Sequence, residues 1–181
     1  MGKITTQDRS RSIGSATPII IESTGVTVNT SYTGVYATKF TISTTTQAIA
    51  AAALGFGIEL GTLPKGNICV ESVSLDLGYV GSGTTTVTPE IGVGTVVAVG
   101  AITTIGAGAA TMEDCMDGTN GTAFAATAAK TYNVMAQGEI DQKDGTTTAK
   151  TLFLNFAGNW ATTETLTFTG SVTVAWYIAH V

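Results

Sequence analysis

The sequence predicts an all-β sandwich of the jelly-roll type, with an extended N-terminal arm and short helical turns in its loops. Three observations predict this fold class. Apolar and polar residues alternate with a period of two in about eight to ten short runs, spaced 8–12 residues apart. The 35 threonines favour strands and the 22 glycines favour turns. No stretch has the period of a long amphipathic helix.

The length of 181 residues suits one domain, and the charges divide the chain into an arm and a body. The arm, residues 1–16, is polar and holds three cations and one acid, a net charge of +2. The body, residues 17–181, holds 5 lysines and 12 acids, a net charge of −7, which makes −5 in total. We expect the body to form a single sandwich. The three cations of the arm are Lys3, Arg9 and Arg11.

The first part of the body predicts short strands and turns. Residues 17–22 contain an apolar run after Pro18 and predict a short strand. Residues 35–43 predict a second strand. Residues 47–54 are rich in alanine and predict one or two helical turns. Residues 63–66, Leu-Pro-Lys-Gly, have proline and glycine where a β-turn favours them.

The middle of the chain predicts a strand over residues 68–79, with Val73, Leu75, Leu77 and Tyr79 on one face. A glycine-rich loop and a strand over residues 84–88 follow, and Pro89 ends that strand.

Residues 91–112 are uncharged over 22 positions, which would suffice to span a membrane. Alternate positions here are apolar and would lie on one face of a strand: Ile91, Val93, Val97 and Val99. We therefore expect a buried strand followed by a loop instead of a membrane span. Residues 107–129 hold short helices or a long excursion between strands.

The C-terminal part predicts four strands. Residues 130–140 and 150–156 alternate clearly, the second with Leu152, Leu154 and Phe156 on one face. Residues 163–169 and 171–181 alternate as well. Gly170 and Ser171 between them predict a tight turn, so these last two strands are expected to form a hairpin.

Few residues of the chain could carry catalysis. His180 is the one histidine and lies beside the last residue, a poor place to hold a catalytic triad. Cys69 and Cys115 belong to no CxxC pair or Cys/His cluster, so we expect buried free thiols and no zinc site. The acidic, charge-poor composition also argues against nucleic-acid binding and hydrolysis. We therefore predict no enzyme activity and no cofactor.

Two acidic clusters predict solvated turns. The first departs from the Asp-x-Asp-x-Asp-Gly loop of calcium sites, although its oxygens could still bind calcium. The second has the composition of a common turn. The clusters are Glu113, Asp114 and Asp117, and Glu139, Asp141 and Asp144.

Parts of the chain resemble small virion proteins of tailed bacteriophages. The pattern is a Leu-Pro-x-Gly turn in residues 61–66, the strand 68–79, a hairpin rich in Gly, Ser and Thr, and a Val-Gly step in residues 91–94. Residues 166–177, LTFTGSVTVAWY, are similar to the closing strands of such sandwiches. The resemblance implies a decoration, or cement, protein on the capsid surface of the virion, which binds the major capsid protein as a trimer. Residues 100–130, rich in Ala and Gly, depart from the pattern.

The residues add two expectations to this structural role. The segments 40–58 and 91–112 are too apolar and charge-free to lie mostly exposed on a monomer, so we expect them at the contacts of a homotrimer. The cations Lys3, Arg9 and Arg11 are expected to anchor the arm to acidic surfaces of the capsid or of a neighbouring subunit. We expect neither nucleic acid nor a membrane as a partner.

Two other functions fit the sequence. A tail, fibre or neck protein could have the same pattern, and it would be present in few copies per particle. A jelly-roll carbohydrate-binding protein or glycan hydrolase would need an exposed aromatic side chain beside acids or amides. Asn159, Trp160 and Glu164 form the one such cluster, although a tryptophan at a strand end more often covers a core or an interface.

Overall fold

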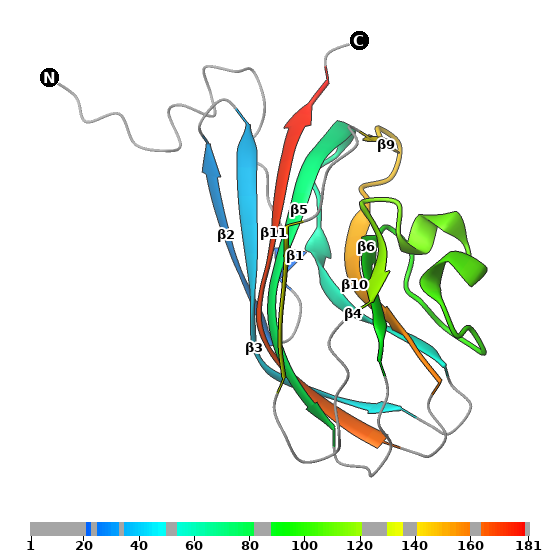
Figure 1. The fold of residues 1–181 in the computed structure, drawn as a ribbon. Coiled ribbons are helices and arrows are strands. Elements are labelled where there is room, and N and C mark those ends of the chain that lie inside the picture. Colours follow the sequence, from blue (N-terminus) through cyan, green and yellow to red (C-terminus); the bar gives the residue numbers. More distant parts are fainter. Residues whose placement is uncertain are drawn as a thin grey trace, which may run out of the picture.

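The computed structural model describes residues 21–22, 25–32, 35–49, 54–81, 88–120, 130–135, 141–159 and 164–179. In these parts the chain forms two antiparallel sheets that face each other, which confirms the predicted all-β sandwich (Figure 1). Sheet A has the order β1–β4–β10–β6–β7, formed by Ile21–Glu22, Gly55–Thr62, Thr151–Ala157, Glu90–Gly94 and Met116–Asn120. Sheet B has the order β2–β3–β11–β5–β8, formed by Val26–Tyr32, Tyr36–Ile49, Glu164–Ile178, Gly66–Gly81 and Lys130–Met135. The strand β9, Asp141–Gly145, also pairs with β5.

Eight of the strands are interleaved in the order of a jelly roll. The chain passes from β3 in sheet B to β4 in sheet A, returns to sheet B with β5, and then enters sheet A again with β6 and β7. It returns to sheet B with β8, to sheet A with β10 and to sheet B with β11. The result is two four-stranded orders, β3–β11–β5–β8 and β4–β10–β6–β7, as in a double-sheet jelly roll. Strands β1 and β2 extend the two sheets at their edges.

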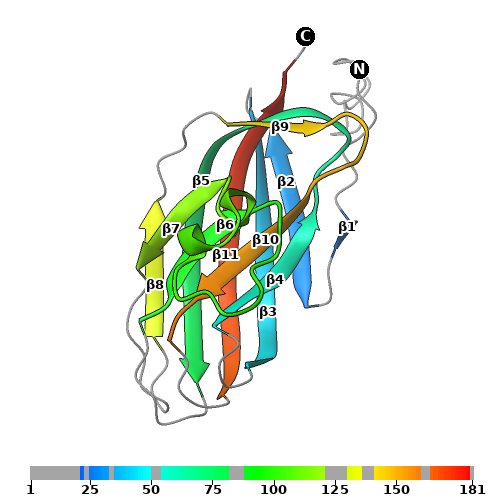
Figure 2. The ribbon, with the colours of Figure 1, turned by 90° about the vertical axis from the view of Figure 1, so that its right-hand side faces the viewer.

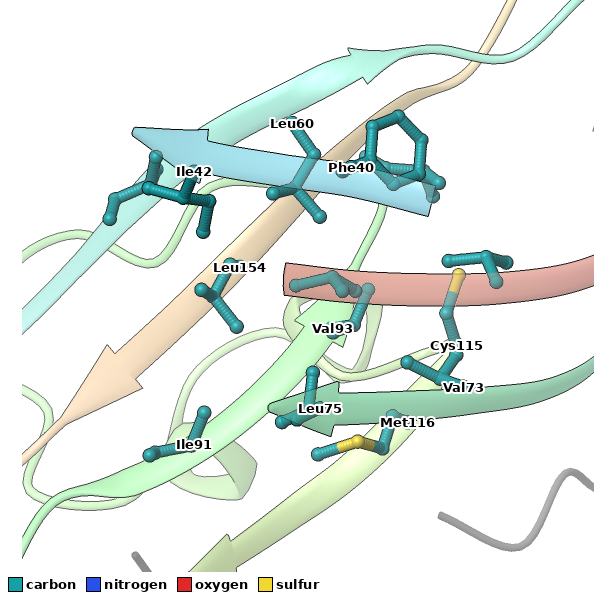
Figure 3. Close-up of a cluster of buried hydrophobic side chains, with 14 of the residues drawn as sticks. Phe40, Ile42, Leu60, Val73, Leu75, Ile91, Val93, Cys115, Met116 and Leu154 are labelled. Carbon is teal, nitrogen blue, oxygen red and sulfur yellow. The ribbon is translucent and has the colours of Figure 1, made fainter. Parts of the chain in front are cut away.

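The core lies between the sheets and takes one face of each strand. In sheet B, Phe40, Val172 and Leu75 are neighbours across β3, β11 and β5. From sheet A, Leu154 and its neighbour Val93 point toward them (Figure 3). All five side chains are buried, with at most 3% of their surface exposed. Burying one face of each strand is the physical cause of the alternation in the sequence.

Aromatic side chains complete the core. The rings of Tyr36 and Trp176 are stacked with centroids 4.5 Å apart. The Trp176 Nε1–H donates to Oγ1 of Thr38 over 2.9 Å, and Thr38 is fully buried. Elsewhere, Phe56 stacks on Phe156 with centroids 4.9 Å apart. The one indole N–H of this core therefore has the partner that a buried donor needs, in the part of the chain that the structure describes.

Several predicted elements are confirmed. Strand β5 contains the predicted strand 68–79, and β10 contains the predicted strand 150–156 except its first residue; their predicted apolar faces are buried. Strand β3 contains most of the predicted strand 35–43, and β8 begins where the strand 130–140 was expected. Short helical turns lie between β6 and β7: η1, Ile105–Ala107, and η2, Ala110–Met112. Residues 17–20, 82–87 and 136–140, which complete other predicted elements, lie outside the described residues.

The predicted C-terminal hairpin is wrong, because residues 164–178 form one continuous strand, β11. Gly170 lies inside it with φ of 126°, at a shift of register against β3. A Cβ atom at this position would lie 2.1 Å from the backbone oxygen of Asp76, so only glycine fits. The buried apolar residues on both sides, from Leu166 to Trp176, lie on one face of the strand. Pairing with β5 continues without a shift through Gly170, so β11 is continuous here, and the extra residue at the register shift lies on β3.

Three further expectations are corrected. Of the helical turns predicted over residues 47–54, Gln47–Ile49 instead continue β3, because they pair with β11 and bury Ile49, and residues 50–53 lie outside the described residues. Asp141–Gly145, expected as a solvated turn, form β9, because the first residues of β5 offer them a pairing edge. The strand predicted from residue 91 ends at Gly94, so Val99 is 60% exposed. A Cβ atom at Gly94 would lie 2.3 Å from the Met112 carbonyl carbon, since the following loop folds back over the strand end.

Candidate functional site

The connection between β6 and β7, residues 95–115, folds over the outer face of sheet A, and we call it the cap. It lies on the side of sheet A that faces away from sheet B, in front of β6 and β10 (Figures 1 and 2). The cap has a small apolar cluster of its own, in which Ala98, Ile105 and Met112 are buried against Ala157 of β10. The cap is therefore packed onto the sheet as a built element of the fold.

Asn155 of β10 fastens the cap to sheet A. Its side chain is fully buried. Its Oδ1 accepts the Ala98 N–H over 2.8 Å, and its Nδ2 donates to the carbonyl oxygens of Val96 and Met112 over 2.9 and 2.6 Å. On the adjacent strand, a Cβ atom at Gly57 would lie 2.3 Å from Oδ1, so a glycine leaves the space for this amide. One side chain thus satisfies three backbone groups from two parts of the cap.

Three carboxylates hold the cap from its ends. Asp114 accepts the backbone N–H of Thr95 over 2.7 Å and the Thr95 hydroxyl over 2.8 Å. Glu90 of β6 accepts the N–H of Ile105. Glu113 accepts the N–H of Gly118 over 2.8 Å. A carboxylate that accepts backbone N–H groups is stabilised without a cation, so these acids act as structural acceptors.

The first acidic cluster is therefore only in part the solvated turn that the sequence predicts. Asp117 is exposed, but Glu113 and Asp114 are half-buried and bound to backbone groups, because the chain needs acceptors where it leaves the cap. Within the described residues, no group of three or more His, Cys, Asp or Glu side chains is placed to hold a metal ion. The side chains of Asp141 and Asp144 lie outside the described part of the structure.

The exposed side chains of the cap are apolar or carry a hydroxyl group, and none of them is charged. Val96 and Val99 are 40% and 60% exposed, and they are the exposed large hydrophobic side chains of the described chain. No charged residue occurs between Glu90 and Glu113. The other exposed positions of the cap have small side chains or none: Gly100, Ala101, Thr103, Thr104, Gly106, Ala107, Ala109, Ala110 and Thr111. This arrangement offers a surface for packing against another molecule.

Both cysteines are buried free thiols, as predicted. Tyr177 of β11 pairs with Cys69 of β5. A hydrogen bond with Cys69 is the main cause that raises the pKa of Tyr177 above 10.0, and desolvation and the charge of Glu71 act in the same direction. Both residues belong to sheet B, so this pair does not belong to the cap on sheet A.

The remaining predicted site residues are not brought together by the described structure. Asn159 is exposed, whereas the side chain of Glu164 is not described. No described helix is long and apolar enough to cross a membrane. The following predicted residues lie outside the described ranges: Lys3, Arg9, Arg11, Glu139, Trp160 and His180.

Sequence reasoning missed Asn155. In an alternating strand, a polar residue between Leu154 and Phe156 predicts a solvent-facing position. A clue was present, because Phe153 and Ala157 share the parity of Asn155 and are apolar. Apolar residues on both faces of a strand indicate that both faces are covered.

No protein-family model matches the chain, and a comparison with curated protein sequences finds no match either. Among solved structures, the chain is similar to the arabinose-bound α-L-arabinofuranosidase MgGH51, with a TM-score of 0.41 and 10% sequence identity. The similarity covers 88% of this chain and 25% of that enzyme's chain.

Proposed function

We propose that the chain is a structural virion protein of a tailed bacteriophage, a decoration (cement) protein that stabilises the head by bridging capsid subunits. The observation that carries this proposal is the cap, which is fastened to the sandwich and whose exposed side chains carry no charge. Three buried or half-buried polar side chains in and beside the cap, Glu90, Asp114 and Asn155, bind backbone groups of the cap. Such a surface suits tight packing better than a reaction, which needs polar groups left available for a substrate.

The major capsid protein is the proposed partner, and the basic arm is the proposed anchor. The arm carries +2 on a chain whose remaining charge is −7, so an acidic capsid surface would attract the arm and not the body. Each exposed ion pair of Lys3, Arg9 or Arg11 contributes about 0.2–1 kcal/mol. A homotrimer presents three arms together, and such weak contacts then act at a high effective concentration.

The copy number per particle tests the proposed function. Purified particles of the virus that encodes this chain are analysed by quantitative mass spectrometry against the major capsid protein. Hundreds of copies, in a fixed ratio to the capsid protein, are expected of a decoration protein. A handful of copies would instead indicate a tail, fibre or neck protein, and absence from the particle would refute a structural role in the virion.

A second experiment tests the anchor. Particles without the protein are mixed with the full chain, with a chain that lacks residues 2–12, or with the variant Lys3→Gln/Arg9→Gln/Arg11→Gln. The variant keeps the length of the arm and removes its cations. Both altered chains should remain folded by circular dichroism but occupy fewer sites, and added salt should lower the occupancy of the full chain. Equal occupancy of all three chains at every salt concentration would show that the arm is not the anchor.

A further inference from the structure

We draw no further inference here: the strongest candidate, the carboxylate pair of Glu90 and Glu113, which converges on Gly118 of β7 where the cap meets sheet A, is an acidic cluster, and nothing else in the described residues points to a ligand there.

Discussion

The substitution Asn155→Ala tests whether side-chain hydrogen bonds hold the cap on sheet A. The amide is fully buried and makes hydrogen bonds of 2.8, 2.9 and 2.6 Å to Ala98, Val96 and Met112. At about 0.5–1.5 kcal/mol net for each bond, the loss is about 1.5–4.5 kcal/mol. A loss of about 3 kcal/mol lowers the Tm of a domain of this size by roughly 6–12 °C.

Urea unfolding measures the free energy of unfolding, and amide hydrogen exchange at Ala98 measures opening of the cap alone. The matched control is Thr151→Ala on the same strand, which removes one half-buried hydroxyl contact of 3.0 Å with Thr62. This control should lower the free energy of unfolding by less than about 1 kcal/mol and leave amide hydrogen exchange at Ala98 unchanged. Local opening of the cap should make exchange the more sensitive of the two measurements for Asn155→Ala.

Asn155→Asp separates the acceptor from the donor of the amide. It keeps an oxygen for the Ala98 N–H but turns a second oxygen toward the carbonyls of Val96 and Met112. Burial against carbonyl oxygens raises the pKa of such a carboxyl group, so this variant should be least stable at neutral pH and should recover on acidification. If Asn155→Ala costs less than about 0.5 kcal/mol and exchange at Ala98 is unchanged, the hydrogen bonds do not hold the cap.

Three further substitutions test other contacts. Gly94→Ala places a carbon 2.3 Å from the Met112 carbonyl carbon and should lower the free energy of unfolding by about 1–3 kcal/mol. An unchanged Tm would mean that the cap moves away from β6 without loss of stability. Thr38→Val removes the acceptor of the Trp176 Nε1–H and should cost about 1–3 kcal/mol in urea unfolding, and equal stability would contradict this role. Because the folded-state pKa of Tyr177 lies above 10.0, its hydrogen bond stabilises the fold below pH 10 and is lost as the pH rises through that pKa. Tyr177→Phe should flatten the decline of stability above pH 10, and parallel curves would refute the assignment.

The strands were predictable where one face meets the core and the other meets water. Residues 68–79 alternate for this reason, and they form most of β5. The strand ends were harder to predict, because local sequence does not determine them. Gly170 fits a turn and the interior of a strand equally well in the sequence. In the structure it pairs with Leu77 inside β11, and the close approach of the Asp76 backbone explains why this position is a glycine.

The candidate site was predictable only in part. The absence of charge over residues 91–112 is visible in the sequence, but which side chains stay exposed depends on how the cap folds back. Ile105 and Met112 are buried there, whereas Val99 is not. The role of Asn155 depends on Ala98, which lies 57 positions away in the chain. No local pattern contains such a contact, because it forms only when two distant segments meet.

The rigidity of the cap and the absence of charge on its exposed side chains have the same physical origin. A loop fastened by lysine or arginine pairs would keep cations near its surface, and these would have to be desolvated when a partner binds. Here carboxylates and one amide bind backbone groups directly, so no cation is needed. It follows that loosening the cap also changes how much charge its surface exposes. If the contacts of Asp114 with Thr95 opened, its carboxylate would become more exposed, and the same step would both loosen the surface and make it more acidic.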